Sequence, residues 1–428
     1  MLLSTQAADL RTWTDDQGRT VEAAFGGLRD GTVLLRLTNG SEVPFDLARL
    51  SAADQAYVKQ QAAAAPAPAP AAGSPIAPVA PHPDRKPAVN STWPSKAEVD
   101  TRKIEISLVS ESAEERHYVY QSDAFTFTSQ DKLAGSVMKE VARTFEATRA
   151  LVQALPWGIV CEPDSDLGRF QAALYETRDD YIRNGGPTNS GGVYDSGDRI
   201  FKIPFPSLGL EMRGKTWFKN DNYRNDTLVH ELTHQMMHDY LPFLPKWIIE
   251  GSAEYTESLP YNAGTFRVEG HKNAIKEHID AMAKYRVSPD IPDLAMHMTM
   301  NRDQWTALSG ESSMQLKLYF HSVLLVYFFN HLDGDGSGLA FRQFMDAVHD
   351  QVLERRAFFN DPRVKRMPGG RFTYPTSLKV PDMKSDTAPF KNLPVLLQGR
   401  DYATLAKQIE EGYRSIGVKL SVSPGQAE

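Results

Sequence analysis

The segment "HELTH" contains the residues of this sequence best suited to chemistry. His230 and His234 are four residues apart, so on a helix their imidazoles lie one above the other on the same face. Two imidazoles at that spacing can bind one metal ion from one side, and Glu231 beside them can carry a proton. We therefore expect this segment to be a helix that carries a metal site.

A third metal ligand must come from elsewhere, because a catalytic zinc ion needs three protein ligands and one open position. His238 continues the four-residue spacing, but it would lie about 6 Å further along the helix axis, too far to share the ion. We interpret it as a helix-end residue that favours the C-terminal dipole. Pro242 and Pro245 then break the chain, and a returning antiparallel helix would bring Glu250 or Glu254 back towards the two histidines.

The combined segment "HELTH…PKWIIEGSAEYTE" resembles the gluzincin metallopeptidases, and more narrowly the bacterial peptidase MA-like families with the signature HExxH…WxxEGxAEY. In those families the glutamate before the glycine is the third zinc ligand. The resemblance implies one Zn²⁺ per chain, held by His230, His234 and Glu250. It also implies that Glu254 hydrogen-bonds a ligand histidine, although a thermolysin-like count would make Glu254 the ligand instead. Gly251 fits a close approach between two helices.

The expected chemistry is hydrolysis of a peptide bond. Zinc lowers the pKa of its water to about 7, so Glu231 could accept a proton from that water and later protonate the leaving amine. Peptidase MA-like proteins also have a later helix with the pattern Y-x-x-S, which Tyr319 and Ser322 match. This resemblance makes Tyr319 a candidate donor to the developing oxyanion, with His321 as its rival.

Substrate binding is expected just before the metal helix. The segment "SGGVYDSGDRIFKI" resembles the edge strand that pairs with an extended peptide in zincins. Its glycines would let another backbone approach closely. The predicted substrate-binding residues are Gly191, Gly192, Val193 and Tyr194.

The sequence divides into three zones. Residues 8–60 alternate apolar and polar side chains, which predicts a small five-stranded barrel followed by a short helix capped by Ser51. This zone resembles the SH3-like homology domain first named in a eukaryotic endocytic adaptor, where it binds short peptides. Residues 61–99 are rich in alanine and proline and should form an extended linker. Residues 100–425 should form the main domain.

The main domain is expected to be α+β, with the zincin arrangement of a small N-terminal sheet and a helical C-terminal part. Helices should dominate after Asp226. Before it, alternation and helical spacing predict strands at 103–109 and 118–129, a helix at 132–155, a buried strand at 158–163, a helix at 167–182 and a strand hairpin at 190–205.

Other features limit the possible functions. The 428 residues carry a net charge of −7, which argues against a phosphate-tracking nucleic-acid binder. No apolar run predicts a membrane span. The single cysteine, Cys161, lies in an apolar segment and should be an inert buried thiol. The segment "DGDGSG" from Asp333 lacks the glutamate of a calcium loop and should only connect helices.

The first residues, "MLLSTQAADL", lack the charged start and apolar core of a signal peptide but resemble its last residues. Either an export signal has been removed from this chain or the protein stays inside the cell, and we expect the former, an extracytoplasmic protein, periplasmic or secreted. The expected partners are a peptide or protein substrate and a peptide or protein ligand of the barrel. The alternative function is a catalytically inactive zincin scaffold that serves as a binding module through the barrel.

Overall fold

The structure is a computed structural model that describes residues 10–29, 32–37, 42–64, 82, 85–220 and 222–425. The chain divides into two compact units, Met1–Ser74 and Pro75–Glu428, which we describe separately. The first nine residues and much of the predicted linker lie outside the described residues. Among the described residues, no helix combines the length and apolar character needed to cross a membrane.

Unit 1 is a small antiparallel sheet followed by a helix. Its elements are β1 (Leu10–Thr14), β2 (Thr20–Arg29), β3 (Thr32–Leu37), β4 (Glu42–Asp46) and α1 (Ala52–Ala64). The described strands pair in the order β1-β2-β3-β4, so the predicted fifth strand is wrong for this part of the chain. A 3-10 turn at Leu47–Arg49 follows β4, and only an isolated bridge between Asp15 and Leu50 stands beyond it.

The core of unit 1 follows from the alternation of its strands. Val33 and Leu35 are two residues apart, point to the same face of β3 and are buried against Trp13. Ser51 caps α1 as predicted, because its hydroxyl accepts a hydrogen bond from the backbone N–H of Asp54 at 3.2 Å.

Unit 2 is mixed α+β and contains a six-stranded sheet. Its strands are β6 (Ser107–Ser112), β7 (His117–Gln121), β8 (Phe125–Ser129), β9 (Phe170–Tyr175), β10 (Val193–Asp195) and β11 (Ile200–Pro204). They pair in the order β10-β11-β9-β8-β7-β6, which makes β10 an edge strand. The long helix α2 (Gly135–Ala154) packs on this sheet through Phe145, whose ring contacts those of Phe127 and Phe201.

Two predictions about this sheet are wrong. The predicted helix at 167–182 is strand β9 followed by a short helix, α3 (Arg178–Arg183). Its segment "FQAALY" has good helix formers, but parallel pairing with β8 on one side and β11 on the other decides the conformation. The predicted strand at 158–163 is irregular, because Gly158 and Cys161 both have positive φ, at 67° and 57°. Cys161 is buried, as expected, and burial raises the pKa of its thiol.

The predicted linker is too long at both ends. Residues 61–64 continue α1, and residues 65–81, 83 and 84 lie outside the described part of the chain. From Arg85 onward the chain packs on unit 2, where the Arg85 guanidinium is 2.6 Å from the Asp346 carboxylate. Strand β5 (Ala97–Glu98) pairs with β15 (Thr265–Phe266), which in turn pairs with β14 (Tyr261–Asn262).

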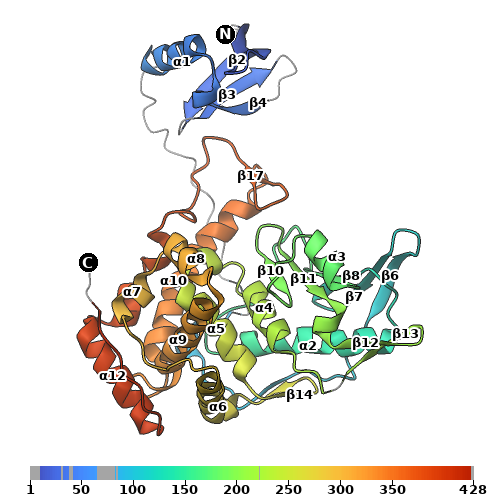
Figure 1. Ribbon diagram of the computed structural model, residues 1–428, viewed down its shortest axis with the longest axis vertical. Helices are drawn as coiled ribbons and strands as arrows, with labels where there is room; N and C mark the ends of the chain where they lie inside the picture. Colours follow the sequence, from blue (N-terminus) through green and yellow to red (C-terminus); the bar gives the residue numbers. More distant parts are fainter. Residues whose placement is uncertain are drawn as a thin grey trace. The chain divides into compact units, whose positions relative to one another are not determined.

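Helices dominate after Asp226, as predicted, and α4 and α5 lie between the sheet and the C-terminal helices (Figure 1). Two further two-stranded sheets are β12 (Leu210–Arg213) with β13 (Thr216–Lys219) and β16 (Lys365–Arg366) with β17 (Phe372–Thr373). The helices are α4 (Asp226–Met236), α5 (Lys246–Ser258), α6 (His271–Lys284), α7 (Leu294–Thr299), α8 (Arg302–Ser309), α9 (Ser312–His331), α10 (Leu339–Asn360), α11 (Leu393–Leu397) and α12 (Tyr402–Ser415).

Gly251 allows α5 to pack against α9 at backbone distance, as predicted from its position after Glu250. A Cβ atom on Gly251 would meet the carbonyl of Ser322, 2.6 Å from its carbon, and would lie 2.8 Å from a methyl group of Val326. Such contacts force the two helices apart, because a backbone carbonyl cannot turn aside as a flexible side chain can.

We expect Gly251→Ala to lower the free energy of unfolding by about 1–3 kcal/mol or more, since overpacking a tight core has that cost. Urea denaturation followed by circular dichroism measures the change. Gly135→Ala is the matched control, because Gly135 begins α2 and a Cβ there meets nothing within 4 Å. Equal stability of the two variants would show that the α5–α9 contact is loose.

Candidate metal centre

The two histidines of "HELTH" lie side by side on one face of α4. Their ring centroids are 4.8 Å apart and the rings are nearly perpendicular, at 86°. His230 is buried, with 8% of its surface exposed, among the apolar residues that fix α4 between α2 and α5. The sequence prediction that both imidazoles share a helix face is confirmed by this arrangement.

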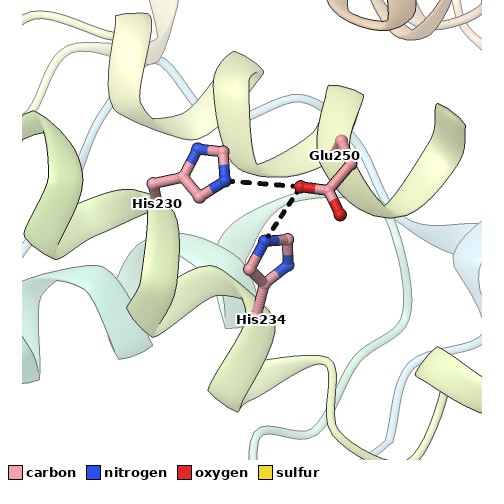
Figure 2. Close-up of side chains that lie close together, drawn as sticks. All are labelled: His230, His234 and Glu250. Atoms are coloured by element: carbon pink, nitrogen blue, oxygen red, sulfur yellow. Dashed lines mark ion pairs between the residues drawn. The ribbon is translucent and has the colours of Figure 1, made fainter. Parts of the chain in front are cut away.

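Glu250 on α5 reaches the same point in space (Figure 2). Its Oε2 atom lies 3.5 Å from Nε2 of His230 and 3.3 Å from Nε2 of His234. Direct N–H···O hydrogen bonds are usually shorter, about 2.7–3.2 Å. A tetrahedral zinc ion about 2.0–2.1 Å from each ligand places its ligand atoms about 3.3–3.4 Å apart. The two distances to Oε2 of Glu250 therefore fit the spacing of a zinc ligand set, and the ligand atoms of all three residues lie within 4.8 Å of one another.

The charges around Glu250 favour its ionised form. Burial raises the pKa of this carboxyl, but the charges of Lys246 and His234 outweigh burial and hold the pKa well below its usual range. Lys246 is one turn earlier on α5, and its Nζ lies 3.1 Å from Oε1 of Glu250, the oxygen that does not face the histidines. Lys246 thus fixes the carboxylate so that one oxygen points at the two imidazoles. We did not identify Lys246 from the sequence.

The predicted partner of the ligand histidines has to be corrected from Glu254 to Glu257. Nδ1 of His230 is 3.1 Å from Oε2 of Glu257 but 3.9 Å from Oε1 of Glu254. The carboxylates of Glu254 and Glu257 face Nδ1 of His230, whereas Glu250 faces its Nε2 atom. Glu254 therefore lies on the other side of the ring from the candidate metal position. Glu250, Glu254 and Glu257 follow each other at four and three residues on one face of α5, and this spacing could have pointed to Glu257.

Hydrogen bonds and burial decide the protonation of this side of the site. Burial lowers the pKa of His230, but the nearby carboxylates of Glu250 and Glu257 outweigh burial and raise the pKa well above its usual value. Burial, followed by the charge of Glu257, raises the pKa of Glu254 to about 8. His278 on α6, which we did not single out as a site residue, places its Nε2 atom 3.7 Å from Glu254.

Glu231 lies beside the histidines and next to the edge strand β10. Its Oε2 atom accepts a hydrogen bond of 2.8 Å from the backbone N–H of Tyr194. The N–H of Tyr194, which we expected to bind a substrate backbone, is therefore already bonded to Glu231. The carbonyl of Tyr194 points to the same free edge, because both groups of a residue in an antiparallel strand face the same side. Of the remaining predicted substrate residues, Val193 begins β10, and Gly191 and Gly192 directly precede it.

Tyr319 and His321 lie on the same helix but in different surroundings. The Tyr319 ring lies parallel to the His230 ring, at 6.0 Å between centroids. Burial and then the charge of Glu250 raise the pKa of Tyr319, so its hydroxyl stays a hydrogen-bond donor. His321 instead bonds the carbonyl of Ser288 at 3.2 Å, and the hydroxyl of Ser322 bonds the carbonyl of Leu318 at 2.6 Å. Of these three residues, Tyr319 is the one that lies against His230 of the candidate site.

His238 and the "DGDGSG" segment both take part in ion pairs. The interpretation of His238 as a helix-end residue is wrong, since α4 ends at Met236 and His238 belongs to a buried ion network with Asp164 and Arg355. The "DGDGSG" segment connects α9 to α10, as predicted, and the Asp333 carboxylate is 2.6 Å from the Arg400 guanidinium.

Comparison with known proteins identifies the class of the N-terminal part. Residues 4–65 match the family SLA1 homology domain 1, SHD1. The small antiparallel sheet described for unit 1 is consistent with an SH3-like domain of this family. Such a domain suggests that unit 1 binds a protein ligand. No curated protein and no solved structure matches the chain.

Proposed function

We propose that unit 2 is a zinc-dependent peptidase of the gluzincin type, built on a zincin-like arrangement of sheet and helices. The observation that supports this proposal best is the convergence of Nε2 of His230, Nε2 of His234 and Oε2 of Glu250 at 3.3 and 3.5 Å. Two imidazoles and one carboxylate are also the ligand types that catalytic zinc prefers.

The residues of the chain would divide the work of hydrolysis. His230, His234 and Glu250 would hold the ion. The ion would act as a Lewis acid and lower the pKa of a bound water molecule to about 7. Glu231 would accept the proton of the attacking water and return it to the leaving nitrogen. Tyr319 would donate a hydrogen bond to the carbonyl oxygen as negative charge develops there.

The test of this proposal is a measurement of zinc and of cleavage on the same preparation. We expect about one zinc ion per chain by mass spectrometry and cleavage of an unstructured protein that stops when a chelator is added. Zinc at one hundred times its dissociation constant should stabilise the fold by about 2.7 kcal/mol, measured as a higher melting temperature. A chain that takes up no zinc would contradict the proposal.

A second candidate function rests on the SHD1 match of residues 4–65. In this alternative, unit 2 is a catalytically inactive zincin scaffold, and unit 1 binds a peptide or protein. Full zinc occupancy without cleavage of any member of a peptide library, together with peptide binding by the full chain, would favour this alternative.

A further inference from the structure

Tyr194 contacts Glu231 with its backbone and a buried ion network with its side chain. Its N–H donates to Oε2 of Glu231 at 2.8 Å, and its hydroxyl oxygen is 2.7 Å from Nδ1 of His238. Tyr194 is 9% exposed, and both contacts are partly buried. Glu231 and His238 are seven residues apart, and Tyr194 spans the distance between them.

The direction of the hydrogen bond between Tyr194 and His238 follows from Arg355. A guanidinium can only donate hydrogen bonds, and Nη2 of Arg355 is 2.7 Å from Nε2 of His238, so Nε2 accepts. A neutral imidazole then carries its proton on Nδ1 and donates it to the hydroxyl oxygen of Tyr194. Burial and then the charge of Arg355 lower the pKa of His238, which keeps the ring neutral.

The ring of His238 is fixed by several segments of unit 2. Arg355 on α10 pairs with Asp239, the residue after His238. Asp164 lies 3.4 Å from Nε2 of His238 and also binds Arg199, at 3.1 Å, and Arg366, at 3.0 Å. Arg199 directly precedes β11 and Arg366 belongs to β16, so the network joins α10, β16, the β10–β11 hairpin and the turn that follows α4.

We propose that Tyr194 is a positioning residue for Glu231. His238 holds the phenol, the phenol holds this part of the edge strand β10, and the strand N–H orients the carboxylate. One oxygen of Glu231 is then occupied by the strand, and the other is left to accept a proton. This inference rests on the proposed peptidase activity for its kinetic consequences but not for its structural ones.

The test is Tyr194→Phe, which removes the hydroxyl and keeps the backbone N–H. We expect kcat to fall about tenfold, the equivalent of one hydrogen bond, while KM and zinc content stay unchanged. Tyr240→Phe is the matched control, because the Tyr240 hydroxyl is also buried and lies 2.7 Å from Nδ1 of His349 without any contact to Glu231. That control should keep kcat within about twofold of the wild type.

A double-mutant cycle separates positioning from general loss of stability. His238→Ala should lower kcat at least as much as Tyr194→Phe, because it also removes the contact with Arg355. The double variant should be no worse than His238→Ala alone, since the contact between Tyr194 and His238 is then already lost. His238→Asn should retain more activity, since its amide can still donate to the phenol. Additive losses, or equal kcat values for Tyr194→Phe and Tyr240→Phe, would overturn the inference.

Hydrogen exchange provides a measurement that does not need activity. Tyr194→Phe should speed exchange of the residue 194 amide about tenfold, and Tyr240→Phe should not, if the phenol holds the strand on Glu231. Unchanged exchange at residue 194 would overturn the inference even in a protein that lacks peptidase activity. An inactive wild type with faster exchange in Tyr194→Phe would overturn only the proposed function.

Discussion

Replacing Glu231 with glutamine should abolish most peptide hydrolysis while the chain keeps about one zinc ion. Glutamine has the shape of glutamate, and its carbonyl oxygen can still accept the N–H of Tyr194, so the site should keep its geometry. It cannot accept a proton from water. Because a general base contributes about 10²–10⁴-fold, we expect kcat to fall by that factor with little change in KM. Steady-state kinetics on a fluorogenic peptide measure the effect.

Glu354→Gln is the control for this substitution. It removes the same charge, and Glu354 is exposed on α10. Its kcat should equal that of the wild type. Two outcomes would contradict the role given to Glu231. Cleavage at the wild-type rate would mean that another group takes the proton, and loss of zinc would mean that Glu231 maintains the metal-binding helix.

Replacing Glu250 with alanine should produce the largest loss of zinc affinity among the glutamates of α5. Its Oε2 atom is the one that lies within 3.5 Å of both Nε2 atoms, so its removal leaves two of the three ligands. We expect zinc affinity to fall by more than about 100-fold, because substituting a residue that only hydrogen-bonds a metal ligand typically lowers metal affinity 10–100-fold. Competition with a chromophoric chelator measures the dissociation constants.

Glu257→Gln and Glu254→Gln are the comparisons within the same helix face. Glu257 bonds Nδ1 of His230 at 3.1 Å, so its variant should lose about 10–100-fold. Glu254 is 3.9 Å from that atom, so Glu254→Gln should lower zinc affinity by a smaller factor. A greater loss for Glu254 than for Glu250 would restore the thermolysin-like assignment, in which Glu254 is the third ligand.

The sequence was informative where one local rule decides the structure. Four-residue spacing predicts that His230 and His234 share a helix face, and the prolines predict that the chain stops and returns. These two rules together bring Glu250 or Glu254 towards the histidines, and the resemblance to the gluzincins selected Glu250. The role of Gly251 could also be predicted, because a glycine beside a site residue on a buried helix indicates a close contact with another helix.

The sequence was misleading where distant partners decide the structure. The segment "FQAALY" has helix formers, but two parallel neighbours make it strand β9. The apolar run around Cys161 contains two residues with positive φ: Gly158, where the glycine permits it, and Cys161, where no local pattern reveals it.

The sequence by itself determined which residue types could hold a dication and on which helix faces they lie. Only the tertiary structure decided that Glu257, and not Glu254, bonds His230, that Lys246 turns one oxygen of Glu250 inward, and that Tyr194 is bound to Glu231. The physical reason is that spacing along a helix fixes a direction but not a distance. The distance depends on how closely α4, α5 and β10 pack, and that packing involves residues from the whole of unit 2.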